Sequence, residues 1–337
     1  MRKYQFFAFA FVLALTTVFS SCKKGMDSVG STSEMLFVTQ NNEQWNGKMG
    51  EAVREYFGDF QHGLPQPEKL FDVKHINSSA FDNIFKKYRN LIIGEIDPNM
   101  SKPFSVETKR NWMSSPQYVI KIKAQNEELW LQAFDSHKEK IKKEFDNNER
   151  ERIWESLRNN DDSGIMKKLR NKYGFSMIIP KGYFIAKDDD NFTWIRHEER
   201  DKSLALFIYQ LPYTSANELS EERIIEKTDS ITRKYIPGPS EKSNEGPYES
   251  YMRLEKDYEH GKAAFTIIPD FPAGYAVEMR GMWDVANDFM AGPYVSYTIV
   301  NPEATKLICV EGYVYYPNHD KRDLLRQLEA LIWSLQF

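Results

Sequence analysis

The first third of the chain alternates short apolar runs with amphipathic segments. A helix is predicted over residues 42–57, where apolar side chains recur on one face as Trp45, Met49, Val53 and Phe57. A second, short helix is predicted over residues 81–88. Strands are predicted where apolar residues alternate or run together, over residues 35–39, 70–76, 91–93 and 118–122.

The longest helical pattern covers residues 126–159. One stripe of this segment is apolar and contains Trp130, Phe134, Ile141 and Phe145, while the remaining faces are highly charged. Such a helix could bind a partner, but packing against the sheet of its own domain is the commoner use. We therefore expect a long helix that lies on the first sheet.

From residue 173 onward the pattern is dominated by strands. They are predicted over residues 175–179, 192–195, 204–211, 251–254, 275–282, 295–300 and 307–316. One helix, over residues 220–235, interrupts them and has Ser220 in the cap position. The chain closes with a second helix, for which Asp320 is the expected cap, and its apolar stripe comprises Leu324, Leu325, Leu328, Leu331, Ile332 and Leu335.

These elements predict an α+β protein built from two α/β-type layers. The first domain is expected over residues 35–172, with strands and helices mixed and the long charged helix included. The second is expected over residues 173–337, as an antiparallel sheet whose one apolar face is covered by helices. The sequence contains no internal repeat.

The extreme N-terminus has the pattern of an export signal. Arg2 and Lys3 precede an apolar run of about 14 residues, which is too short to span a bilayer. Phe19-Ser20-Ser21 then stands directly before Cys22, as in the lipobox of bacterial lipoproteins, although Leu is usual where Phe19 stands. We expect residues 1–21 to be a signal peptide, Cys22 to carry lipid such as palmitate, and residues 22–34 to form a flexible tether.

Composition narrows the class of protein further. The 45 Lys and Arg residues nearly balance 49 Asp and Glu residues, so the chain lacks the basic excess expected for a nucleic-acid partner. After acylation of Cys22 the other cysteine, Cys309, has no partner for an intramolecular disulfide. Its neighbours are apolar, which predicts a buried, inert thiol.

Motifs for catalysis or metal binding are missing from the sequence. The six histidines are scattered, and neither a zinc-binding pattern nor a nucleophile elbow or phosphate-binding loop occurs. Residues 188–191 (Asp-Asp-Asp-Asn) crowd oxygen ligands together but lack the glycine and closing glutamate of a calcium loop, so a turn is predicted there. The sequence favours a non-enzymatic protein without a cofactor or metal.

The segment from Met279 to Tyr297 is the most unusual part of the body because it interleaves charged and aromatic side chains. It could form a binding surface for a sugar or peptide, or a tightly packed corner between two strands, and packing is the commoner outcome. The residues that would bind in the first case are Arg280, Trp283, Asp284, Asp288 and Tyr294.

The lipobox, the helix around Trp45 and the segments 280–283 (Arg-Gly-Met-Trp) and 288–293 (Asp-Phe-Met-Ala-Gly-Pro) together resemble a family of uncharacterised envelope lipoproteins from Bacteroidetes-type bacteria. The resemblance covers the mature chain and departs at Ala291, where a second glycine is expected. It implies an envelope location and no activity. The second half is loosely similar in fold to PsbP and Mog1-type proteins, which concerns fold alone.

The resemblance also implies a location and a modification. Surface lipoproteins of such bacteria carry acidic residues directly after the lipidated cysteine, whereas Lys23 and Lys24 follow here. We therefore expect an outer-membrane anchor with the body in the periplasm; the cell surface is the alternative. Envelope proteins of these bacteria are O-glycosylated at Asp-Ser followed by an apolar residue, which marks Ser28 and Ser230, and Ser28 is preferred because the tether is expected to be exposed.

Three functions remain open. The first choice is a non-enzymatic envelope module that binds a protein or glycan partner. The second is a carbohydrate- or peptidoglycan-active hydrolase that uses carboxylates such as Asp284 and Asp288. The third is a structural lipoprotein that serves assembly.

Overall fold

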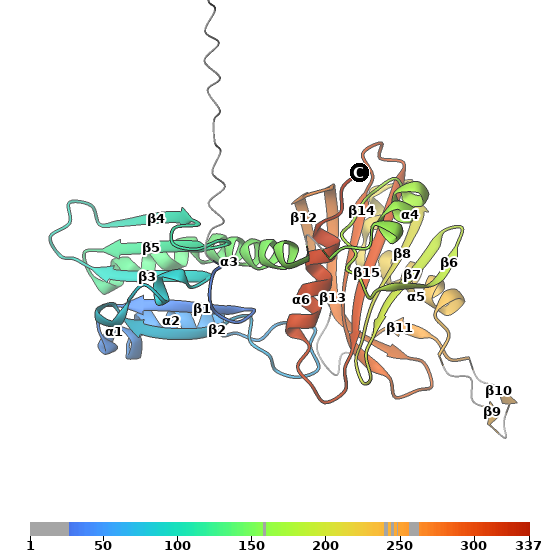
Figure 1. Cartoon of the computed structure of the whole chain (residues 1–337), viewed down its shortest axis with the longest axis horizontal. Helices are drawn as coiled ribbons and strands as arrows, with labels where there is room; N and C mark the ends of the chain where they lie inside the picture. Colours follow the sequence, from blue (N-terminus) through green and yellow to red (C-terminus); the bar gives the residue numbers. More distant parts are fainter. Residues whose placement is uncertain (1–26, 158–159, 239–241, 244–245, 248, 256–262) are drawn as a thin grey trace, which may run out of the picture.

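A computed structural model describes residues 27–157, 160–238, 242–243, 246–247, 249–255 and 263–337. The fold is α+β, with two sheets that each carry helices (Figure 1). The elements of the first half are β1 (Glu34–Thr39), α1 (Asn42–Asn46), α2 (Lys48–Phe57), β2 (Asp72–Asn77), η1 (Ser78–Ala80), η2 (Phe85–Lys87), β3 (Asn90–Ile96), β4 (Phe104–Arg110), β5 (Tyr118–Ala124) and α3 (Glu127–Leu157).

The first sheet has the strand order β2-β1-β3-β5-β4 and is parallel except for the antiparallel pair β4–β5. Helices α2 and α3 cover one of its faces, where aromatic side chains such as Phe57, Trp130 and Phe145 are fully buried. The segment that contains η1 and η2 covers the other face. The predicted long helix therefore does pack on its own sheet.

Residues 27–34 pack onto this domain, so the expectation of a free tether is wrong for them. Asp27 and Val29 form β-bridges to Ser115 and Tyr88, and β1 begins at Glu34. These bridges to the segments that lead into β3 and β5 fix this stretch to the first domain. The remainder of the predicted tether lies outside the described residues.

Two local predictions in this half need correction. The helix over residues 42–57 is interrupted at Gly47, which ends α1 and precedes α2. The predicted helix over residues 81–88 is reduced to the single 3₁₀ turn η2, and strand β4 was not predicted. β4 is a half-exposed edge strand whose tip is entirely polar and charged, so its sequence carries no apolar alternation to reveal it.

The second half contains α4 (Ser163–Tyr173), β6 (Phe184–Asp189), β7 (Phe192–Glu198), β8 (Ser203–Pro212), η3 (Ala216–Leu219), α5 (Glu221–Tyr235), β9 (Lys242–Ser243), β10 (Gly246–Pro247), β11 (Met252–Leu254), β12 (Ala264–Phe271), β13 (Gly274–Val285), β14 (Ala291–Val300), β15 (Lys306–Tyr315) and α6 (Arg322–Trp333). Its large sheet is antiparallel, with the strand order β11-β13-β14-β15-β8-β7-β6 and β12 paired to β13.

Both faces of this sheet are apolar, which differs from the expected single apolar face. Helices α4 and α6 cover one face, and α5 covers the other (Figure 1). Alternation along β15 shows the division, because Ile308 and Val310 belong to the α6 side whereas Cys309 and Tyr313 belong to the α5 side. We call the second surface the α5 face.

Four further predictions for this half were wrong or missing. Residues 175–179 form no strand; Ser176 instead makes an isolated bridge to Gln336. Helix α4 was not predicted; its start is capped by the carboxylate of Asp162, which accepts the backbone N–H groups of Gly164 and Ile165. Strands β6 and β12 were also missed, since most of their side chains are exposed or half-exposed.

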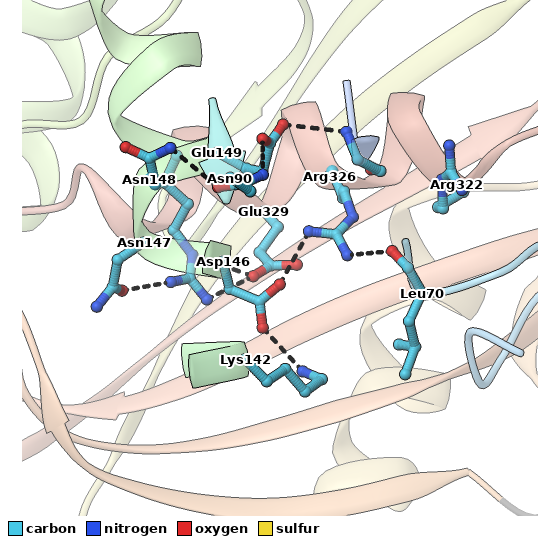
Figure 2. Close-up of polar contacts among 12 residues, drawn as sticks. Leu70, Asn90, Lys142, Asp146, Asn147, Asn148, Glu149, Arg322, Arg326 and Glu329 are labelled. Carbon is cyan, nitrogen blue, oxygen red and sulfur yellow. Dashed lines mark hydrogen bonds and ion pairs between the residues drawn. The ribbon is translucent and has the colours of Figure 1, made fainter. Parts of the chain in front are cut away.

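The two halves meet where α3 lies against α6, and this joint is polar (Figure 2). The carboxylate of Glu329 on α6 accepts hydrogen bonds from Arg150 on α3 at 2.8 Å and from Arg280 on β13 at 2.5 Å. Nearby, Arg326 on α6 donates to Asp146 on α3 at 2.9 Å. Ion pairs between residues far apart in sequence therefore hold the two halves together.

Candidate functional site

A pocket of about 480 Å³ in the second half opens on the α5 face. It lies between the β7–β8 turn on one side and the end of α5, β11 and the β13–β14 turn on the other, with β15 beneath. Its apolar and aromatic lining comprises Trp194, Ile236, Pro237, Met252, Trp283, Val285, Met290, Tyr313 and Tyr315. We call it the aromatic pocket.

Four aromatic side chains build one wall of the aromatic pocket. The indole Nε1 of Trp194 donates to the hydroxyl of Tyr313 at 3.0 Å. Trp283 packs edge-on against Tyr313, with ring centroids 5.2 Å apart, and lies close to Tyr315. Trp194 and Tyr315 are half-buried, whereas Trp283 and Tyr313 are buried behind them. The guanidinium of Arg196 lies over the Trp194 ring, 4.7 Å from its centroid. Trp194 and Tyr315 are thus the more exposed rings of the wall, and Trp283 and Tyr313 support them.

The mouth of the aromatic pocket carries equal numbers of cations and anions, all from the end of β7 and the turn that follows it. They are Arg196, Arg200, Lys202, Glu198, Glu199 and Asp201. Arg196 pairs with Glu198 at 2.5 Å, and Lys202 pairs with Glu199 at 2.9 Å. The rim therefore presents no net charge to an approaching ligand.

Glu311 is the most unusual side chain near the aromatic pocket. It lies on β15, two residues before Tyr313 and on the same face, and it is 2% exposed. Among the residues that the structure describes, neither carboxyl oxygen has a hydrogen-bond partner. Burial, and then the neighbouring charge of Asp229, raises the pKa of Glu311 well above its usual range. The environment of Glu311 therefore favours the protonated, neutral form of its carboxyl group.

The five residues proposed as a binding surface from the sequence do not form one surface. Successive residues of β13 point to opposite faces, so Arg280 enters the polar joint beside Glu278 and Glu329 while Trp283 lies on the α5 face. Tyr294 is 1% exposed and Trp283 is 2% exposed. The packed-corner alternative is thus correct for these three residues, although Trp283 also supports the pocket wall.

The two candidate catalytic carboxylates have structural roles of their own. Asp284 forms a bidentate pair with Arg253 on the adjacent strand β11, at 2.7 and 3.0 Å. Asp288 accepts the backbone N–H of Met290 inside the turn that joins β13 to β14. Neither residue lines the aromatic pocket.

The predicted modification sites differ in how the structure places them. Cys22 lies outside the described residues. Ser28 is 6% exposed and its hydroxyl accepts a hydrogen bond from Arg152, so the expected exposure of this serine is wrong. Ser230 is exposed on α5. Glycosylation of either serine stays a prediction.

Other sequence predictions concern thiol and metal chemistry. Cys309 is free and buried, and burial raises the pKa of its thiol to about 12, which confirms an inert thiol. Asp190 and Asn191 form the predicted turn, between β6 and β7. In the described part of the chain, no group of His, Cys, Asp or Glu side chains is arranged to hold a metal ion. Likewise, no helix among the described residues is long and apolar enough to cross a membrane.

Sequence reasoning missed Glu311, Trp194, Tyr313 and Tyr315. A signal for Glu311 was present, because it is the one charged residue in the apolar run from Leu307 to Tyr316. A carboxylate in such a strand must point into the core or mark an exposed strip, and alternation with Cys309 and Tyr313 indicates the core. The aromatic residues had no comparable signal, since Trp194 comes from β7 whereas Tyr313 and Tyr315 come from β15.

Comparisons with known proteins agree with this two-part organisation. A domain of unknown function (DUF8532) matches residues 28–158, and a second domain of unknown function (DUF4837) matches residues 162–334. No curated protein matches the chain. Among solved structures, the human StarD13 (DLC2) lipid transfer and protein localization domain is 11% identical, with a TM-score of 0.23, over 51% of this chain and 94% of that one. Because the DUF4837 match spans more than half of the sequence, the chain belongs to that family of unknown function.

Proposed function

We propose that this protein is a lipid-anchored module of the bacterial cell envelope whose C-terminal domain binds a small, ring-containing ligand in the aromatic pocket. The observation that carries the proposal is the wall of Trp194, Tyr313 and Tyr315 around a space of about 480 Å³. Pockets of about 300–1,000 Å³ with aromatic linings are typical of small-molecule sites.

The shape and chemistry of the wall favour a flat ring over a flexible chain. The half-buried rings of Trp194 and Tyr315 offer surfaces for stacking, and the hydrogen bond from Trp194 to Tyr313 holds two of the rings in place. A pre-arranged wall reduces the entropy lost on binding. Sugars of the envelope and small aromatic compounds both present such rings.

The anchor is supported by the N-terminal sequence pattern and by the resemblance to envelope lipoproteins of Bacteroidetes-type bacteria. Each buried methylene of an acyl chain contributes about 0.8 kcal/mol, so several chains on Cys22 would hold the protein on a membrane. Lys23 and Lys24, directly after the cysteine, favour an outer-membrane anchor with the body in the periplasm. Intact-cell proteolysis tests the orientation: loss of the protein without lysis would place it on the cell surface instead.

Ligand-observed NMR tests the pocket. The purified mature protein is mixed with a panel of monosaccharides, 2-phenylethanol and phenethylamine, and saturation transfer is recorded for wild type and for Trp194→Ala. At least one probe is expected to bind, with an affinity reduced about fivefold or more in Trp194→Ala, because stacking on an aromatic ring is worth roughly 1 kcal/mol or more.

The matched control is Trp112→Ala, since Trp112 is 38% exposed on the loop between β4 and β5 of the other domain. This variant should bind as wild type does. Absence of transfer from every probe, or equal binding by Trp194→Ala and wild type, would reject the pocket as a ligand site. For the anchor, Cys22→Ala should leave the membrane fraction; retention there would reject lipidation at Cys22.

A further inference from the structure

A short stretch of chain separates the expected lipid from the folded body. Residues 23–26 are all that lie between Cys22 and Asp27, and Asp27 already pairs with Ser115 of the first domain. Fully extended, the chain from Cys22 to Asp27 spans at most about 18 Å. The point where the chain enters the first domain is therefore held close to any membrane that contains acyl chains on Cys22.

Two segments of the first domain surround this entry point. The backbone N–H of Val29 donates to the carbonyl of Lys87, at the end of η2, at 3.0 Å. The hydroxyl of Ser114, in the loop between β4 and β5, donates to the same carbonyl at 2.9 Å. The segment around η2 and the β4–β5 loop are thus joined to each other and to the entering chain.

Both segments expose large apolar side chains to solvent. Ile84, just before η2, is 65% exposed, and Trp112, in the β4–β5 loop, is 38% exposed. Within residues 27–157, Phe60 is the one other large apolar side chain that is exposed. Two of these three side chains therefore lie beside the end of the chain that is expected to carry the lipid. Tryptophan in particular is enriched where proteins meet the membrane–water interface.

Cations outnumber acids around these apolar side chains. The Nζ atom of Lys109 lies 5.5 Å from the centroid of the Trp112 ring. Residues 23–27, 82–88 and 109–113 together contain six cations and two acids: Lys23, Lys24, Lys86, Lys87, Lys109 and Arg110, against Asp27 and Asp82. Arg110 is paired with Glu144 of α3, which leaves an excess of three positive charges.

Exposed apolar side chains among lysines are the features of a surface that rests on a membrane. The apolar groups enter the headgroup region, and the lysines are attracted by anionic lipid headgroups. A protein partner could also cover such a surface. The short distance from the expected lipid favours the membrane, because it holds this surface within reach of the bilayer at all times.

We infer that the first domain docks on the membrane that holds the lipid of Cys22. The docking surface, which we call the anchor face, comprises Ile84, Lys86, Lys87, Lys109, Trp112 and Met113. This inference rests on the proposed lipid anchor. Ile84 and Trp112 contact the headgroup region and the lysines contact anionic headgroups, so the body has a fixed orientation on the membrane.

A dye attached to one cysteine tests the docking. Asn83, which is exposed beside Ile84, is replaced by cysteine in the lipidated protein and labelled with a nitrobenzoxadiazole maleimide. The native cysteines do not react, because Cys22 carries lipid on its sulfur and Cys309 is buried. The labelled protein is reconstituted into vesicles of phosphatidylethanolamine and phosphatidylglycerol, with and without a lipid that carries a nitroxide on its headgroup.

The nitroxide quenches a dye that lies at the headgroups. The matched reporter is Phe289→Cys, since Phe289 is 89% exposed on the β13–β14 turn of the other half. We expect quenching at least about threefold stronger for the dye at position 83 than for the dye at position 289, because Ile84 and Trp112 lie at the interface.

Charge substitutions show whether the anchor face is responsible. Added to Asn83→Cys, either Trp112→Glu or Ile84→Glu places a negative charge among anionic headgroups, so quenching should fall to the level of position 289. Both side chains are exposed, and circular dichroism checks that each variant is folded. Phe289→Glu, added to Asn83→Cys as the control, should leave the quenching unchanged.

The outcomes separate docking from anchoring. Equal quenching at positions 83 and 289, or strong quenching at position 83 that survives both charge substitutions, overturns the docking while the lipid anchor stands. Wild type that fails to sediment with the vesicles rejects the anchor itself, and the docking inference with it.

Discussion

Glu68 caps a helix that begins more than 250 residues later in the chain. Its carboxylate oxygens accept the backbone N–H groups of Lys321 at 2.8 Å and Arg322 at 2.9 Å, at the first turn of α6. The expected cap, Asp320, is therefore replaced by a residue from the loop that precedes β2. A negative charge at a helix N-terminus satisfies free N–H donors and interacts favourably with the helix dipole.

Removal of this cap should destabilise the protein modestly. Glu68→Ala leaves the two N–H groups of α6 without their partner, and we expect a loss of about 1 kcal/mol in the free energy of unfolding. Urea denaturation followed by circular dichroism measures it. Glu55→Ala is the control, because Glu55 is exposed on α2; equal stability of the two variants would contradict a capping role for Glu68.

Glu329 should contribute far more than Glu68 to the free energy of unfolding, because it joins α3, β13 and α6. Glu329→Ala leaves Arg150 and Arg280 buried without their shared carboxylate, and we expect a loss of about 3–5 kcal/mol. Denaturation of this variant beside Glu222→Ala provides the measurement. A loss below about 1 kcal/mol would mean that the joint is not held by this charge network.

The Glu329 network also predicts acid sensitivity. Burial alone would raise the pKa of Glu329, but Arg280 and Arg150 together lower it to about 2, below the ordinary value of 4.5. Because the pKa is lowered, the ionised Glu329 stabilises the folded state above pH 4.5, and this stabilisation is lost as the pH falls from 4.5 toward about 2. Stability measured across this interval should fall more steeply in wild type than in Glu329→Gln. Parallel curves would contradict the assignment.

Glu311 predicts the opposite pH dependence. The pKa of Glu311 is raised in the folded state. The folded state is therefore most stable at a pH below the pKa that Glu311 has in the unfolded chain, and this stability is lost as the pH rises toward its pKa in the folded state. Within that window, stability should decrease by about 1.4 kcal/mol per pH unit. Glu311→Gln remains neutral and should remove this slope. As the pH rises from acid to neutral, the free energy of unfolding of the variant should therefore increase relative to that of wild type. An unchanged slope in Glu311→Gln would show that Glu311 ionises normally.

Substitution of Trp283 by alanine should lower stability far more than the same substitution of Trp112. Trp283→Ala removes a side chain that is 2% exposed and packed against Tyr313, so we expect a loss of about 3–5 kcal/mol and a clear fall in melting temperature. Trp112→Ala removes a side chain that is 38% exposed and should change stability by less than about 0.5 kcal/mol. A Trp283→Ala protein as stable as wild type would instead indicate an accessible surface at this position.

Secondary structure with a strong apolar period could be predicted from the sequence, whereas weakly patterned elements could not. The strand over residues 204–211 and the long helix α3 are examples of the first kind, since burial of one face or both imposes a visible pattern. Strand β12 is an example of the second, because Ile267 is exposed and proline interrupts the run. The segment around the 3₁₀ turn η2 was predicted to be a helix because its apolar residues have helical spacing. In the structure, Phe81 and Phe85 pack against the sheet, but the segment forms only a single turn.

The candidate site was predicted only in small part. Trp283 was identified, but it was grouped with Arg280 and Asp284, which point to other surroundings because side chains alternate along β13. Trp194 and Tyr315 become neighbours only when β7, β8 and β15 are ordered within one sheet. No local pattern contains that order.

The sequence by itself determined the α+β class, the strong helices and strands, and the chemical character of single positions such as the apolar run around Cys309. These features follow from local periodicity and side-chain type, which act over a few residues. Tertiary structure alone decided that Glu68 caps α6, that Glu329 joins three elements, and that the carboxyl group of Glu311 is buried. Each of these depends on contacts between segments distant in the chain, because the free energy of a buried charge or cap is set by the groups that surround it in space.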